Sequence, residues 1–385
     1  MPFYSALTEC PALVAQPSGC AVLTFSFCLC PRGHPDRIGH FFPSHKRERR
    51  PRSGEISFAG SPFSRFRFVF REMHLSLWRP ANPRLWPQTA KIGFCSGPQA
   101  TLRHVKLHTT VNKIEVEIDL PGVSEAAYNA AAIRIDTALT DPEVKNREVI
   151  SEAFLELLNL CPVANASDLW HHVVYRLYCE IFPKHRNQDP KQSWVRASGE
   201  ALESSVERLY VPVLAPHGIQ IQALIGRDQK IAALEEMGLG KEVGNSKLDV
   251  ALRYEAGKSQ WKIFGGAHIK ASLAERVSDD VPASRSMMKK GYFSPLWTLD
   301  VKSFPPPTGD LLNRGELGTP KVPSEKRKYV EEHGEFDNCY SANARSAPSE
   351  NKTRSGKHVF TLDLSKQPDQ FAQDIITEVQ KRKAK

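Results

Sequence analysis

Three polar residues interrupt apolar patterns in the second half of the chain, and their side chains suit the hydrolysis of a phosphodiester. Glu203 lies in the helical pattern SWVRASGEALESSVERLY, Asp249 interrupts the apolar run KLDVAL, and Lys270 ends the apolar run WKIFGGAHIK. A buried charge is costly unless an opposite charge lies beside it. Carboxylates hold Mg²⁺ through oxygen, a bound metal activates water, and a lysine can hold the phosphate. We therefore expect Glu203 and Asp249 to bind Mg²⁺ and Lys270 to complete the catalytic set.

The predicted secondary structure can bring these residues together. The apolar runs around Asp249 and Lys270 read as two strands with a Gly-Lys turn between them, which predicts a hairpin. The helix that carries Glu203 is expected to pack beside this hairpin. These elements predict an α/β fold whose mixed sheet core, over residues 190–310, is flanked by helices. The other elements expected in this core are strands at 219–225 and 292–305 and helices at 227–242 and 272–280.

The segments around this core have different patterns. Residues 105–189 show helical periodicity after an alternating segment at 109–122, so they predict a strand followed by a mainly helical N-terminal subdomain. Within it, Asp141 and Pro142 predict an N-cap and a first helical position. Residues 311–357 are polar and rich in Gly, Pro, Ser and Lys, which favours a loop or a partly disordered segment. Residues 358–385 predict a C-terminal strand and helix.

The first 104 residues differ in composition from the rest of the chain. The formal net charge is +9, and residues 1–104 carry all of it, with 14 basic and 5 acidic side chains. The segment shows neither helical periodicity nor sustained alternation. We interpret it as upstream sequence translated from an early start codon, and exclude it from fold prediction. A basic nucleic-acid-binding arm built on HKRERRPR is the main alternative, and a secretory signal is disfavoured because no basic segment precedes the apolar run.

Composition limits the class of protein. Outside residues 1–104 the cysteines are Cys161, Cys179 and Cys339, and none has a partner at metal-ligand spacing. We therefore predict free thiols in a reducing cytoplasm and no zinc site. No apolar run reaches the roughly 18 residues that a membrane helix needs, so no membrane contact is expected.

The order and spacing of the three segments resemble a known family. Arg196, Gly199, Leu202 and Glu203 form R-x-x-G-x-x-L-E, followed by the strand Asp249, and then by a strand-end lysine and the sequence SLAER. This pattern is similar to that of the PD-(D/E)XK nucleases, and within them to type II restriction endonucleases of the CCGG-reading group (BsaWI-like). The resemblance covers about residues 190–305.

This resemblance implies an activity, a cofactor and partners. It implies Mg²⁺-dependent cleavage of double-stranded DNA at a short palindromic site, with Glu203, Asp249 and Lys270 as the catalytic residues. A palindrome has two-fold symmetry, so a homodimer is expected. It also implies a cognate DNA methyltransferase in the same restriction-modification system, as a functional rather than a physical partner.

Base reading is expected just after the strand-end lysine. Glu275 and Arg276 stand at the start of a predicted helix; arginine donates to guanine O6 and N7, and glutamate accepts from cytosine N4. Arg285, Lys289 and Lys290 could contact phosphates, which position a protein on DNA without specifying its sequence. A solvated helix face is the alternative for the Glu-Arg pair.

The sequence departs from the family pattern at three positions. Leu248 stands where proline is usual before the aspartate, His268 stands where an acid is usual, and Ala274 stands where an arginine is usual. Histidine is a poor Mg²⁺ ligand. Two alternatives follow: a nuclease-fold protein that binds DNA without cutting it, and a repair or mobile-element nuclease of low sequence preference.

Other residues compete for the same roles. Asp300 and Lys302 in the segment TLDVK could form a rival catalytic pair on a strand. Glu235 and Glu236 could ligate a metal, but an exposed helix face is the simpler interpretation. His171 and His172 are interpreted as core or solvated histidines, because no third ligand lies near them in the sequence.

Overall fold

The computed structural model describes most of the chain from His104 onward. The interpretation of residues 1–104 therefore falls almost wholly outside the described residues, and so does Glu275. Among the residues that are described, no helix is both long and apolar enough to cross a membrane. The described ranges are 104–111, 114–240, 242–244, 247–257, 260–274, 276–302 and 313–384.

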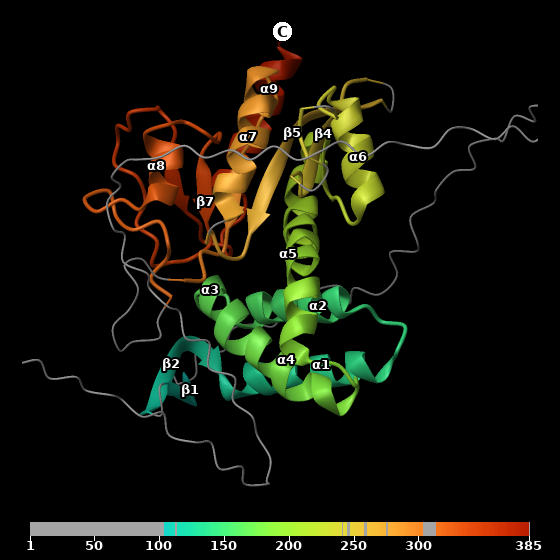
Figure 1. Ribbon diagram of the computed structural model, residues 1–385, viewed down its shortest axis with the longest axis vertical. Coiled ribbons are helices and arrows are strands. Elements are labelled where there is room, and N and C mark those ends of the chain that lie inside the picture. The colour runs from blue at the N-terminus through green and yellow to red at the C-terminus, as the bar shows by residue number, and fades with distance from the viewer. Residues whose placement is uncertain are drawn as a thin grey trace, which may run out of the picture. The chain divides into compact units, whose positions relative to one another are not determined.

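A six-stranded mixed sheet forms the centre of the second half of the chain, which confirms the expected α/β fold (Figure 1). Its strands are β3 (Ile219–Ala223), β4 (Val250–Glu255), β5 (Trp261–Lys270), β6 (Leu296–Thr298), β7 (Cys339–Ser341) and β8 (Val359–Thr361). They lie in the order β3-β4-β5-β6-β7-β8. Pairing is antiparallel from β3 to β5 and parallel from β5 to β8. The predicted hairpin is thus β4–β5, and β6 is shorter than the strand predicted at 292–305.

Helices cover both faces of this sheet. They are α5 (Pro190–Leu214), α6 (Arg227–Glu236), α7 (Arg276–Lys289), α8 (Glu325–Glu331) and α9 (Gln370–Lys383). Consecutive strand residues point to opposite faces. In β6, Trp297 belongs to the hydrophobic cluster that includes side chains of α5 and α9, whereas Leu296 belongs to the cluster with α7 and α8. Tyr340 and Cys339 in β7 divide in the same way, so each helix pair has its own face.

Two adjacent glycines let β5 pack closely against its neighbours. A Cβ atom on Gly265 would collide with the backbone of Phe293, and one on Gly266 would collide with the side chain of Leu248. Leu248 directly precedes Asp249, so this close contact also helps to fix the position of Asp249 just before β4.

The N-terminal part is mainly helical, as expected, and begins with a hairpin. The alternating segment 109–122 divides between two strands, which pair antiparallel as a separate sheet. Helix α2 begins at Asn146 rather than at the predicted Asp141-Pro142 cap, because Asp141 ends α1 instead. The elements here are β1 (His104–Val111), β2 (Ile114–Ser124), α1 (Glu125–Thr140), α2 (Asn146–Leu160), α3 (Ala166–Asp168), a π-helical turn at Leu169–Val174, α4 (Tyr175–Ile181) and 3₁₀ turns at Phe182–Lys184 and Ala215–His217.

Helix α5 links the helical part to the sheet. Asp189 caps its first turn and Pro190 starts it, which suits proline's fixed φ and missing N–H. Its buried side chains contact α2 through Ser205 and Ser151, whose hydroxyls lie 2.9 Å apart. Near its other end, the Tyr210 hydroxyl donates to Asp369, the cap of α9. One continuous hydrophobic cluster therefore extends from β1 and β2 to α9.

Residues 313–357 are more ordered than their polar composition indicated. They contain α8 and β7, where a loop or partly disordered segment was expected. The difference is explained by polar groups that satisfy one another. Arg327 is fully buried and donates to Glu331 and to the carbonyl oxygens of Leu317 and Gly318. The expected C-terminal strand and helix are β8 and α9.

Candidate active site

The fold brings the three residues expected to carry the chemistry into one buried cluster. Asp249 lies directly before β4, and Lys270 is the last residue of β5; the Lys270 Nζ lies 2.7 Å from the Asp249 Oδ2. That oxygen also accepts a 2.9 Å hydrogen bond from the Ile269 N–H. Glu203 projects from α5, which contacts both β3 and β5. Glu203 and Asp249 are 6% and 3% exposed, so their charges are balanced by protein groups rather than by water.

The two carboxylates have opposite electrostatic settings. Burial, together with the negative charge of Asp249, raises the pKa of Glu203 to about 8. Burial also opposes ionisation of Asp249, but the ammonium groups of Lys270 and Lys230 outweigh it and lower its pKa to about 2. Burial works against the charge of Lys270 as well, yet Asp249 and Asp280 raise its pKa overall. An ionised Asp249 beside a charged Lys270 is therefore the fixed element of the cluster.

Two further charged residues complete the cluster. Lys230 on α6 lies 3.5 Å from Glu203 Oε1 and 3.4 Å from Asp249 Oδ1. Asp280 on α7 is 3% exposed, and its Oδ2 lies 2.9 Å from the Lys270 Nζ. Acidic and basic groups thus alternate through the cluster, which lowers the cost of burying each of them.

His268 is buried among protein groups beside the cluster. Its ring is fully buried, packs edge-on against Phe336, and lies 3.2 Å through Nε2 from the Ser294 hydroxyl. Burial lowers the pKa of this imidazole. The acid of this neighbourhood is Asp280 instead, whose Oδ2 lies 3.8 Å from the His268 Nδ1. His268 thus stands where an acid is usual, two residues before the lysine, and α7 supplies a carboxylate close by instead.

The donor set fits a divalent metal. Carboxylate oxygens are the ligands that such cations prefer. Glu203 Oε2 is buried and makes no hydrogen bond with any described group, which leaves one oxygen open for a ligand. Among the described residues no group of three or more His, Cys, Asp or Glu side chains is arranged to hold a metal. Glu203 and Asp249 would therefore share the coordination with water and substrate.

The rival pair has a different environment. Asp300 is fully buried, and its carboxylate accepts hydrogen bonds from the Glu316 N–H and the Ser346 hydroxyl. Lys302 is exposed. Glu236 pairs with Arg253 and accepts from a backbone N–H of β5, so it supports the sheet.

The described residues expected to contact DNA lie on α7 or directly after it. Arg276 is its first residue, and Lys289 is exposed near its end. Arg285 is 65% exposed at its side chain and forms a two-pronged pair with Glu335, while Lys290 pairs with Glu242. Arg285 and Lys290 would therefore have to exchange these partners for phosphates.

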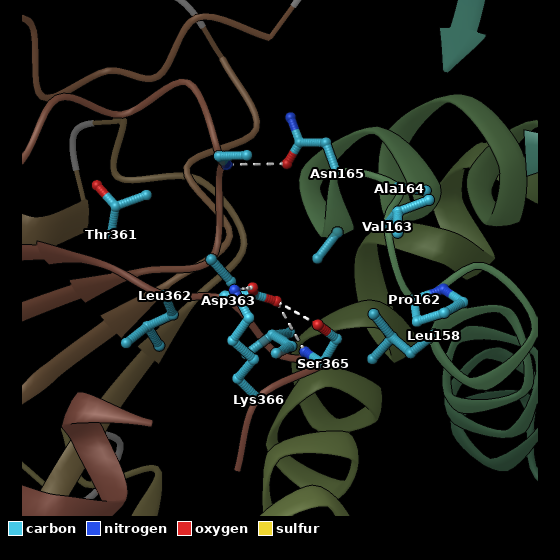
Figure 2. A pocket seen from close by; sticks show the side chains of 14 residues that line it. Leu158, Pro162, Val163, Ala164, Asn165, Thr361, Leu362, Asp363, Ser365 and Lys366 are labelled. Atoms are coloured by element: carbon cyan, nitrogen blue, oxygen red, sulfur yellow. Dashed lines mark hydrogen bonds and ion pairs between the residues drawn. The ribbon is translucent and has the colours of Figure 1, made fainter. Parts of the chain in front are cut away.

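A separate cavity of about 450 Å³ lies between the segment after α2 and the segment after β8 (Figure 2). Leu158 and Pro162 line one side, and Asp363, Ser365 and Lys366 line the other. Its charged groups are paired with each other, because Asp363 accepts from Ser365 and lies 2.8 Å from Lys366. None of the cluster residues lines this cavity.

Two cluster residues, Lys230 and Asp280, were missed in the sequence, because α6 and α7 bring them to the cluster through packing between distant segments. Both had a usable signal. Lys230 shares a helical face with the buried Ala233 and Leu234, and Asp280 shares one with the buried Val277. A charged residue on the apolar face of a helix needs a partner, so it indicates a buried cluster.

Comparisons with known proteins identify relatives of this chain. A family model described as "BsaWI restriction endonuclease type 2" matches residues 228–367. The chain is 47% identical over 265 residues to the type II restriction enzyme AgeI of Thalassovita gelatinovora, which covers 68% of this chain and 94% of that enzyme. The crystal structure of a specific AgeI–DNA complex matches with a TM-score of 0.66 at 45% identity, covering 71% of this chain and 99% of the solved chain.

Proposed function

This chain belongs to the type II restriction enzymes, which are site-specific endodeoxyribonucleases, and on that premise we propose that Glu203, Asp249 and Lys270 carry its chemistry. The family generally uses a divalent metal, and we assign Mg²⁺ to the pair Glu203 and Asp249. One observation carries this assignment. Asp249 is held ionised by Lys270, while the neighbouring Glu203 keeps a buried oxygen that has no hydrogen-bond partner among the described residues.

The mechanism follows from what each residue can do. A bound divalent metal would supply an activated water and would neutralise developing negative charge. Asp249 stays ionised because the Ile269 N–H and the Lys270 ammonium hold its Oδ2. Lys270, fixed between Asp249 and Asp280, is a positioned charge for the oxygens of the scissile phosphate. Water adds to phosphorus, and the bond from phosphorus to the leaving sugar oxygen breaks.

The substrate is double-stranded DNA, and a short palindromic site accounts for the remaining assignments. Such a site calls for a two-fold symmetric homodimer, since each subunit would then cut one strand. Protection of the host sequence would require a cognate methyltransferase, and the enzyme would act in the cytoplasm, where the DNA is.

Digestion of plasmid DNA tests the catalytic assignment. With Mg²⁺, the protein should give discrete fragments, and Lys270→Ala should lower the cleavage rate by at least about 10²–10³-fold because a positioned charge is lost. Lys262→Ala is the matched control, since Lys262 is exposed on the same strand. Full activity in Lys270→Ala would refute the assignment. Sequencing the fragment ends would give the recognition site.

Sequence reading is assigned to Arg276, the first residue of α7, and to Glu275, which precedes it in the sequence. Arg276→Ala should weaken binding to the specific site by about 1–3 kcal/mol, the value of a lost base contact. Lys289→Ala should weaken binding to all sequences alike, because a phosphate contact carries no sequence information. Competition binding with specific and random duplexes measures both effects. If Arg276→Ala prefers the specific sequence as strongly as the wild type does, the interpretation of the Glu-Arg pair as a solvated helix face would be the correct one.

A further inference from the structure

One ammonium group bridges the two carboxylates assigned to the metal. The Lys230 Nζ lies 3.5 Å from Glu203 Oε1 and 3.4 Å from Asp249 Oδ1. Both separations exceed the 2.7 Å between Lys270 and Asp249. Lys230 is thus shared between two acids rather than bound tightly to one. A divalent metal bound between Glu203 and Asp249 would compete with this cation for the negative charge of the two side chains.

The two cations in the cluster differ in how they are fixed. Lys270 ends a central strand and contacts two buried aspartates, Asp249 and Asp280. Lys230 lies in the first turn of α6, and the residues before it, 226–229, are exposed to solvent. A lysine stem has several rotatable bonds. Withdrawal of Lys230 into water therefore needs only rotation of its side chain, whereas Lys270 would have to leave two buried partners.

We propose that Lys230 is an internal counter-ion, which neutralises Glu203 and Asp249 in the metal-free enzyme and leaves when a divalent metal binds. The inference rests on the proposed function, because it takes these two carboxylates as the metal ligands. It follows that the free enzyme binds metal more weakly than its carboxylates alone would allow. With an internal competitor, the apparent affinity for metal equals the intrinsic affinity multiplied by the fraction of time for which the site is free.

Calorimetric titration of the full chain with Ca²⁺, in the absence of DNA, tests this competition. Lys230→Met keeps the apolar stem and removes the charge, so Ca²⁺ should bind about tenfold more tightly than to the wild type. Lys247→Met is the control for general electrostatics, since Lys247 lies 3.6 Å from Asp280 in the same region. Its affinity should change about twofold or less. Equal affinities in the wild type and Lys230→Met, or an equal gain in both variants, would overturn the proposal.

Chemical labelling of lysines gives a second, independent measurement. The Lys230 side chain is 14% exposed, so an amine-reactive acylating reagent should modify it slowly in the metal-free protein. Added Ca²⁺ should speed this modification several-fold and leave Lys247 unchanged, as measured by mass spectrometry of peptides. Unchanged or slower labelling of Lys230 would show that it stays in place and would overturn the proposal.

Asp249→Asn separates failure of this inference from failure of the proposed function. If Ca²⁺ binds to the wild type but not to Asp249→Asn, the carboxylates hold the metal, and the Lys230 results then decide the inference alone. If both bind Ca²⁺ equally, the metal site has been assigned to the wrong residues, and the counter-ion role is overturned along with it.

Discussion

Two buried acidic sites lie on the same sheet and solve the problem of burial in different ways. The Asp300 carboxylate is held by neutral donors, a backbone N–H and a hydroxyl, which the fold fixes in place. The Glu203–Asp249 cluster relies on the ammonium groups of Lys230 and Lys270. Fixed neutral donors leave Asp300 nothing further to bind. Charged side chains can exchange partners, so the second site can take a metal and a phosphate.

This contrast separates stability from activity. At Asp300 both carboxylate oxygens accept hydrogen bonds from protein groups, so loss of this side chain should destabilise the fold. At Glu203 one buried oxygen has no partner among the described groups, so its loss should be felt by the reaction. A buried acid with an unused oxygen thus marks function more clearly than burial alone.

The largest effect is expected from Glu203→Gln. Gln keeps the shape but cannot ionise to bind the metal assigned to Glu203, so cleavage should fall by at least about 10²–10³-fold. The thermal unfolding temperature should stay the same or rise, because Gln carries no charge that is costly to bury beside Asp249. Plasmid digestion and calorimetry measure the two properties. Unfolding at a clearly lower temperature would show that Glu203 supports the fold, as Asp300 does.

The next effect is expected from Asp300→Ala. The Glu316 N–H and the Ser346 hydroxyl would lose their acceptor, which should lower the free energy of unfolding by about 3 kcal/mol. Denaturant unfolding measures this loss. The cleavage rate per folded molecule should remain within about twofold of the wild type, because Asp300, unlike Glu203, is expected to support the fold and not the reaction. A large loss of rate in the folded variant would revive the rival pair Asp300 and Lys302.

The smallest effect is a pH dependence of stability. Burial raises the pKa of Asp300 to about 6, although bonds from Ser346 and the Glu316 N–H oppose this. The native protein therefore keeps a proton that the unfolded chain has already lost, and stability falls as pH rises. Between pH 5 and 7 this contributes a loss of about 1 kcal/mol. The difference in unfolding free energy between the wild type and Asp300→Asn should shrink by this amount, and a constant difference would contradict it.

The sequence predicted the strand and helix positions that matter for the site. Asp249 and Lys270 meet because a hairpin of known register brings the start of one strand to the end of the next. Glu203 meets them because its helix buries one face on that hairpin. Each inference needs only local periodicity and a short turn.

Contacts between distant segments were not predicted. Lys230 and Asp280 reach the cluster through the packing of α6 and α7; helical spacing marks both side chains as facing inward but does not identify what they contact. The segment that includes residues 313–357 was predicted to be a loop or partly disordered because its many polar groups were expected to bind water. Instead Arg327 is fully buried with partners inside the same segment. Polar composition measures the need for hydrogen bonds but not where they are found.

Helix α5 has a consequence for how this protein can vary in length. Along one helix, Ser205 contacts α2, Glu203 reaches the acidic cluster, and Tyr210 binds the cap of α9. Inserting or deleting one residue turns everything after it by about 100°. After a single such change between Ser205 and Tyr210, the residues on the two sides of it could no longer contact their partners at the same time. Length differences among relatives should accordingly accumulate in the connecting loops, while the number of residues in α5 stays fixed.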